Sequence, residues 1–236
     1  KLTEFRKPIK IETKISVNAE GTAKVTIGET EVIAGIKLNV GEPFTDTPDK
    51  GILIIGAELI PSANPDFESG PPGDQATELA RVVDRGIRES NMIELKKLCI
   101  REGELVWMIF LDIYPINDAG NLMVACALAS VAALKNTVFP KLEKDKVIFG
   151  ELTKEKLPIK NIPITTTAYL INNKIIIDPN LKEESVIDAR LTVSFSEDGN
   201  IHALQKGGDK GLTQEQIEKI FDICFEKSKE IRKLLK

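Results

Sequence analysis

Residues 105–111 have the sequence Leu-Val-Trp-Met-Ile-Phe-Leu, an uninterrupted apolar run between Glu104 and Asp112. Seven residues are enough for a strand, and a strand without polar positions is typical of one whose two faces are both covered. We therefore expect a central strand here, with the other elements of the fold arranged around it.

The segments on either side of this run alternate between strand and helix patterns. Residues 120–134 predict a helix so rich in alanine that it lies close against its neighbours, because small side chains let backbones approach. Residues 74–91 carry apolar side chains at helical spacing on one face. Residues 8–40 show strand patterns that predict three strands, and residues 51–60 predict a buried strand between two long loops.

The second half of the chain repeats this order of elements without repeating its sequence. Two strand pairs are expected within residues 165–178 and 186–205, and a closing helix begins at a capping box of Thr213 and Gln216. The charged, proline-bearing stretch at residues 139–163 separates the halves, so we place domains at 1–150 and 151–236. Strands followed by a helix in both halves predict an α/β fold, or α+β layers.

Composition excludes several classes of protein. The 236 residues are 42% hydrophobic and 29% charged, which is ordinary for a globular chain. No apolar run approaches the roughly 18 residues of a membrane helix, and residues 1–15 lack the apolar middle of a secretion signal. Three scattered cysteines and a single histidine, His202, argue against disulfides, zinc sites and Ser-His-Asp catalysis. We expect a cytoplasmic protein with no membrane contact, no cofactor and no bound metal.

Three of the seven arginines lie within eight positions, at Arg81, Arg85 and Arg88. At about 100° per residue they form one stripe on the helix predicted over residues 74–91. The planar guanidinium suits phosphate or carboxylate, so the stripe is a candidate site for a polyanion or a partner. The alternative is a solvated helix face with ion pairs such as Glu78 to Arg81 or Asp84 to Arg88. The net charge of −4 means that any contact with nucleic acid is local.

Two further clusters are weaker candidate sites. Asp178, Glu183, Glu184 and Asp188 could converge on a metal ion, but Lys182 stands among them, so a solvated turn is the favoured interpretation. The glycine-rich residues 207–211 lack the Gly-Lys-Ser/Thr ending of a phosphate-binding loop and lead directly into the Thr213 cap, which favours a simple turn.

Four segments in register resemble the RNase PH family, and within it the non-catalytic ring subunit of the archaeal exosome. The residues that carry the resemblance are Glu78–Ser90, Asn117–Leu122, Asp188–Val193, and Asp198–Gly199 with Leu204–Gly208. The match runs in order from about Phe5 to Leu235. It implies a two-part fold of the ribosomal protein S5 domain 2 type, in agreement with the two strands-then-helix halves.

Active members of this family degrade RNA from its 3′ end with inorganic phosphate, and this sequence departs from both of their motifs. Where they hold the phosphate with Gly-Gly-Thr/Ser-Arg or a serine pair, this chain has Asn121 and Leu122 at the last two positions. Of their two aspartates six residues apart, Asp188 matches the second and Lys182 replaces the first. The resemblance therefore implies no catalytic residue in this chain, although a gap of one or two would align Glu183 or Glu184 instead.

The resemblance also implies partners. Silent and catalytic subunits alternate as heterodimers in a hexameric ring, RNA-binding cap subunits sit on that ring, and the arginine helix of the silent subunit approaches single-stranded RNA at the partner's active site. This favours RNA binding by Arg81, Arg85 and Arg88 over a solvated face. The alternative function is an active phosphate-dependent exoribonuclease that works alone. A small-molecule enzyme on the same fold is disfavoured because no nucleotide-binding loop is present.

Overall fold

The computed structural model describes residues 2–235, and its first sheet is built around the apolar run. The strands follow the order β1-β2-β3-β6-β4, with β5 paired to β6. Their bounds are β1 Ile9–Thr13, β2 Gly21–Ile27, β3 Thr30–Gly41, β4 Ile52–Ala57, β5 Cys99–Arg101 and β6 Leu105–Asn117.

Strand β6 occupies the interior position that the apolar run predicts. It pairs antiparallel with β3 and parallel with β4, so that Ile109 has Leu38 on one side and Leu53 on the other. The expectation that both faces are covered is wrong. Ile109 and Leu111 are buried on one face, whereas Met108 and Phe110, whose side chains alternate onto the opposite face, are only half-buried. Helices pack against one face of this sheet, and the other face keeps apolar side chains partly accessible to solvent.

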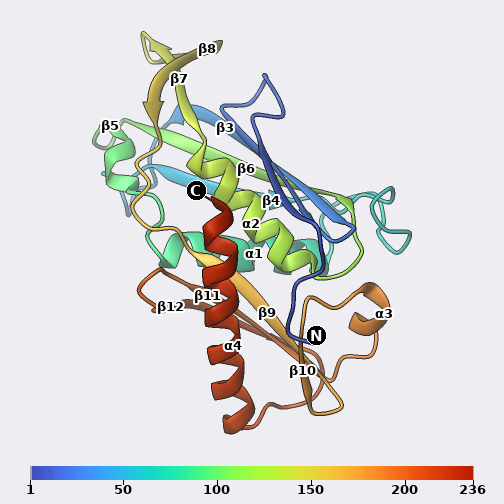
Figure 1. Ribbon diagram of the computed structural model, residues 1–236. Helices are drawn as coiled ribbons and strands as arrows, with labels where there is room; N and C mark the ends of the chain where they lie inside the picture. The colour runs from blue at the N-terminus through green and yellow to red at the C-terminus, as the bar shows by residue number, and fades with distance from the viewer. Residues whose placement is uncertain (1, 236) are drawn as a thin grey trace.

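Two helices lie between this sheet and a second one (Figure 1). Helix α1 spans Asp74–Glu89 and α2 spans Leu122–Lys135. The second sheet has the order β10-β9-β11-β12, and α4 covers its other face. The bounds are β9 Ile164–Ile171, β10 Lys174–Ile177, α3 Leu181–Glu184, β11 Ala189–Phe195, β12 Ile201–Gly207 and α4 Gln214–Arg232.

Smaller elements complete the chain. Strands β7 and β8 form a hairpin that projects away from the two sheets (Figure 1). The bounds are η1 Leu95–Leu98, β7 Val138–Glu143, β8 Lys146–Lys156 and η2 Lys233–Leu235. The predicted order of strands followed by helix is thus confirmed in both halves. The division of the chain near residue 150, a position inside β8, stays a prediction.

Close packing places the two inner helices. Every residue of α2 from Leu122 to Leu134 is buried, as its alanine content predicts. Helix α1 lies close to the second sheet because Gly86 has no side chain there. A Cβ atom at Gly86 would lie 2.8 Å from Ser194 Oγ on β11. This close approach directs the outer side of α1, with its arginines, along the edge of the second sheet at β12.

Within residues 2–235, no helix is both long enough and apolar enough to cross a membrane.

Candidate RNA-binding helix and degenerate active site

The N-terminus of α2 is shaped by an unusual backbone. Gly120 has a φ of +103°, and a Cβ atom there would lie 2.5 Å from the carbonyl oxygen of Pro179. Asn121 follows in the left-handed conformation, with a φ of +57°. Asparagine tolerates this conformation better than most residues with a side chain. The turn brings the start of α2 directly against the segment that follows β10.

The side chain of Asn121 is fully enclosed and bonded. Its Nδ2 donates to Asp178 Oδ1 at 2.8 Å, and its Oδ1 accepts from the hydroxyl of Tyr169 at 3.3 Å. Its backbone N–H donates to Glu184 Oε1 at 3.0 Å. Leu122, the next residue, is buried. Asn121 and Leu122 therefore belong to the interior of this protein. The donors of Asn121, which a bound anion would need, already donate to the carboxylates of Asp178 and Glu184.

Arg6 is the main partner of this cluster, and no sequence pattern had pointed to it. Its Nη2 donates to Asp178 Oδ1 and its Nε to Oδ2, both at 3.0 Å, while its backbone N–H donates to Oδ2 at 2.6 Å. The same guanidinium donates to the carbonyl oxygens of Ala119 and Gly120. The side chain of Asp178 is completely buried. Local patterns are silent on this pair because 172 residues separate its two members.

Glu184 is held in the same cluster. Burial raises the pKa of its carboxyl group, and the nearby Tyr169 hydroxyl and the hydrogen bond from the backbone of Asn121 oppose this rise. The interpretation of Asp178, Glu183, Glu184 and Asp188 as a solvated turn is therefore wrong for Asp178 and Glu184, which point inward. Glu183 remains exposed and closes a capping box with Asn180 at the start of α3.

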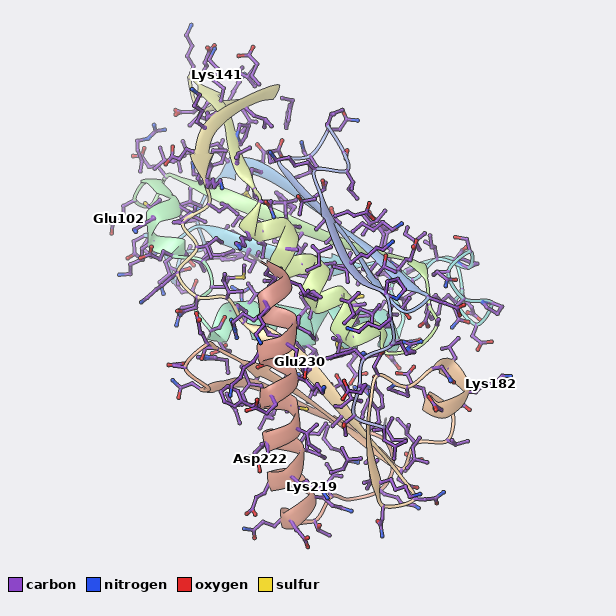
Figure 2. The ribbon with its side chains drawn as sticks, in the orientation of Figure 1. Glu102, Lys141, Lys182, Lys219, Asp222 and Glu230 are labelled. Atoms are coloured by element: carbon purple, nitrogen blue, oxygen red, sulfur yellow. The ribbon has the colours of Figure 1, made fainter. Side chains whose placement is uncertain are left out.

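Asp188 is not bonded to this cluster, and it pairs with a different cation from the one that Asp178 pairs with. Lys210 Nζ approaches Asp188 Oδ1 at 2.7 Å, and the backbone N–H of Asn172 donates to Oδ2 at 2.8 Å. The hydrogen bond with Lys210 holds the pKa of Asp188 below its ordinary value. Lys182 does not compete for the acidic group as expected, since it points outward from α3 into solvent (Figure 2).

The four residues predicted as degenerate active-site positions lie on three separate parts of the chain. Asn121 and Leu122 start α2, Lys182 is exposed on α3, and Asp188 precedes β11 beside Lys210. Within residues 2–235, no group of three or more histidine, cysteine, aspartate or glutamate side chains is placed to hold a metal ion.

The arginine stripe lies exposed along α1. Arg85 Nη2 donates to Gln205 Oε1 on β12 at 2.6 Å. Arg88 pairs with Asp84 at 2.7 Å, as the solvated-face interpretation expects, and also donates to the carbonyl oxygen of Leu53 at 3.2 Å. Across the part of the chain that the structure describes, no hydrogen bond or ion pair engages the guanidinium of Arg81.

The expected pair of Glu78 with Arg81 is absent from residues 2–235. Glu78 instead accepts from Arg190 Nη2 at 2.7 Å and from Gln205 Nε2 at 3.0 Å. Among the described residues, Arg81 therefore keeps all its donors free on the exposed face of the helix, and Arg85 keeps most of its five. The stripe can contact an extended anion without first breaking an internal ion pair at either position.

Two sheets that enclose two helices, with the arginine-bearing helix α1 packed against α2, define a protein of the RNase PH class. Two models described as the 3′ exoribonuclease family match the chain, domain 1 over residues 4–140 and domain 2 over residues 161–227. The chain belongs to the 3′ exoribonuclease family, which confirms the resemblance and the fold that it implies.

The relatives are more specific. The chain is 47% identical over 235 residues to exosome complex component Rrp42 of Methanocella arvoryzae, covering 100% of this chain and 88% of that protein. It is 43% identical over 233 residues to the component of the same name from Archaeoglobus fulgidus, covering 99% of this chain and 88% of that protein.

Solved structures agree with these relatives. A chain of the Archaeoglobus fulgidus exosome with RNA bound to the active site has a TM-score of 0.91 and 42% identity, covering 100% of this chain and 90% of that chain. A chain of an archaeal exosome core has a TM-score of 0.87 and 39% identity, covering 99% and 88%.

Proposed function

We propose that this chain is a non-catalytic subunit of an archaeal exosome, a phosphorolytic 3′-to-5′ RNA-degrading complex of the cytoplasm. It structures the active site of a catalytic RNase PH-like partner subunit and binds RNA beside that site. The observation that carries the proposal is the state of the carboxylates. Asp178 pairs with Arg6 and Asp188 with Lys210, so a metal ion at either carboxylate would have to compete with a cation of this chain.

The same observation argues against the alternative, an exoribonuclease that is active alone. Glu183 is used to cap α3, and Glu184 accepts a hydrogen bond from the backbone N–H of Asn121. Neither glutamate therefore replaces the missing aspartate at Lys182. The start of α2 offers the buried Leu122 where active relatives carry a charged or hydroxyl donor, so an attacking phosphate would lack charge-assisted hydrogen bonds.

RNA binding is assigned to Arg81, Arg85 and Arg88. Their guanidinium groups suit phosphate oxygens, and a contact limited to the backbone of RNA carries no sequence preference. The net charge of −4 does not oppose this, since the RNA would meet a local basic stripe.

The partners in this proposal are the catalytic subunit, alternating with this chain in a hexameric ring, and RNA-binding cap subunits on the ring. Partly uncovered apolar side chains support an assembly of this kind. Ile54 is 42% exposed on β4, next to the half-buried Phe110 on β6, and Phe149 is 64% exposed on the β7–β8 hairpin. Where such side chains are contiguous, as Ile54 and Phe110 are, an apolar patch on a monomer marks a surface that binds other proteins.

The test is an assay for nucleoside diphosphates released from a labelled single-stranded RNA in the presence of magnesium and inorganic phosphate. We expect none from the purified chain and phosphate-dependent release from the chain reconstituted with its catalytic partner. Turnover by the pure chain would favour the alternative function.

A matched variant locates the chemistry within the complex. Asp188→Asn in this chain should leave the rate of the reconstituted complex unchanged, because the carboxylate of Asp188 pairs with Lys210 of this chain. Loss of activity by a normally assembled Asp188→Asn complex would show that this chain contributes a catalytic group.

A further inference from the structure

A row of polar side chains joins α1 to the second sheet. Gln205 on β12 stands between Arg85 and Glu78: its Oε1 accepts from Arg85 at 2.6 Å and its Nε2 donates to Glu78 at 3.0 Å. The other oxygen of Glu78 accepts from Arg190 on β11 at 2.7 Å. The row therefore runs from Arg85 through Gln205 and Glu78 to Arg190.

The chemistry of these groups sets the orientation of the amide. A carboxylate only accepts hydrogen bonds, so Glu78 requires the NH2 group of Gln205 to face it. The carbonyl oxygen of the amide then faces Arg85, which only donates. Glu78 is itself held by Arg190, whose guanidinium packs on Gly207, where a Cβ atom would lie 2.7 Å from Arg190 Cζ.

We propose that Gln205 is a positioning residue that holds the guanidinium of Arg85 in place for an RNA phosphate. The inference rests on the proposed RNA-binding role of Arg85. Gln205 occupies one of the five donors of the guanidinium and leaves the others for the phosphate. A long arginine side chain loses much rotamer freedom on binding, and a contact that orders it beforehand lowers that cost.

Arg85 differs in this respect from its two neighbours on α1. Arg88 is held by Asp84 of the same helix, and Arg81 makes no hydrogen bond or ion pair with residues 2–235. Arg85 alone among the three is bonded to a side chain of the second sheet. Its position therefore depends on how α1 is seated against β12, which connects RNA binding to the packing of the two halves.

The experiment uses the chain reconstituted with its catalytic partner and a labelled single-stranded RNA of mixed sequence. Gln205→Met keeps the length of the side chain and removes both hydrogen bonds. We expect RNA binding to weaken by about two- to tenfold, the effect of one net hydrogen bond, with KM raised and kcat little changed. In an Arg85→Ala background, Gln205→Met should have no further effect, because residues that act as a pair are not additive.

Glu78→Gln is the matched control. It removes the ion pair with Arg190 but keeps an oxygen that can accept from Gln205, so the unfolding midpoint should fall while RNA affinity is nearly retained. If Gln205 and Glu78 only stabilised the fold, RNA affinity would follow stability. The variant with the lower unfolding midpoint would then also bind RNA more weakly.

Each outcome has a distinct meaning. Equal effects of Gln205→Met with and without Arg85 would overturn the positioning role, as would failure of the Gln205→Met chain to assemble. Wild-type affinity in the Arg85→Ala complex would overturn the proposed RNA-binding role of Arg85 itself. Weaker binding with Arg85→Ala but unchanged binding with Gln205→Met would overturn only the positioning role.

Discussion

The guanidinium of Arg6 and the buried carboxylate of Asp178 are joined by two side-chain hydrogen bonds of 3.0 Å, although 172 residues separate them. Their contact ties the segment before β1 to the segment after β10, beside the start of α2. The start of α2 is thus a polar junction within this chain, completed by its own side chains.

Replacing Arg6 by methionine should lower the free energy of unfolding by about 3 kcal/mol, because it leaves the buried carboxylate of Asp178 without its cation. Two hydrogen bonds from backbone and amide donors remain, which places the loss at the low end of the range for broken buried pairs. Urea unfolding measures it. As a control, Arg101→Met removes two exposed ion pairs, with Glu104 and Asp145, and should leave the midpoint nearly unchanged. Equal midpoints for the two variants would contradict the assignment.

The triple variant Arg81→Ala, Arg85→Ala, Arg88→Ala should weaken RNA binding by the reconstituted complex similarly for all sequences. For each phosphate that is no longer contacted, the magnitude of the salt slope should fall by about 1. Binding titrations at several salt concentrations measure this, with Arg101→Ala as an exposed arginine outside the stripe. A normally assembled triple variant with wild-type RNA affinity and degradation rate would show that the stripe is a solvated face with no role in RNA binding. A triple variant that does not assemble would instead identify these arginines as subunit contacts.

Glu184→Gln should stabilise the isolated chain increasingly as the pH rises. Burial places the folded pKa of Glu184 above its ordinary value of 4.5, so the folded state binds the proton more tightly. The stabilisation from that proton is complete below pH 4.5 and is lost as the pH rises through the folded pKa. Each unit by which the folded pKa exceeds the unfolded pKa corresponds to about 1.4 kcal/mol in the free energy of unfolding.

Urea unfolding of the wild type and the Glu184→Gln variant between about pH 4.5 and 7.5 measures this dependence. Asp188→Asn is the control: Lys210 lowers the pKa of Asp188 from its ordinary value of 3.8, so the contribution of Asp188 is complete above that pH and is lost only in stronger acid. Within the measured range this variant should therefore differ from the wild type by a constant amount. A difference between Glu184→Gln and wild type that does not change with pH would refute the burial of this charge.

The catalytic partner should raise the melting temperature of this chain in a concentration-dependent way. A ligand at about 100 times its Kd stabilises the folded state by roughly 2.7 kcal/mol through mass action. Differential scanning fluorimetry of mixtures measures the shift, and heat-inactivated partner serves as the control. Identical melting curves at concentrations where the subunits bind would count against the heterodimer.

Local sequence patterns predicted the order of strands and helices, the burial of α2 and the arginine stripe on α1. These features depend on residues within one or two turns of each other, and hydrophobic periodicity records them directly. The capping box at Thr213 and Gln216 is confirmed for the same reason, since its hydrogen bonds join residues three apart. The resemblance of four segments in register identified the family.

The tertiary structure alone decided which cations neutralise the acidic group and which face of β6 is covered. Sequence proximity favoured Lys182, whereas Arg6 and Lys210 make the contacts, and Glu78 turns to Arg190 instead of Arg81. The physical reason is that an ion pair depends on distance in space, which the path of the whole chain sets. Coverage of a sheet face likewise depends on where distant helices pack, and no pattern within the strand records that.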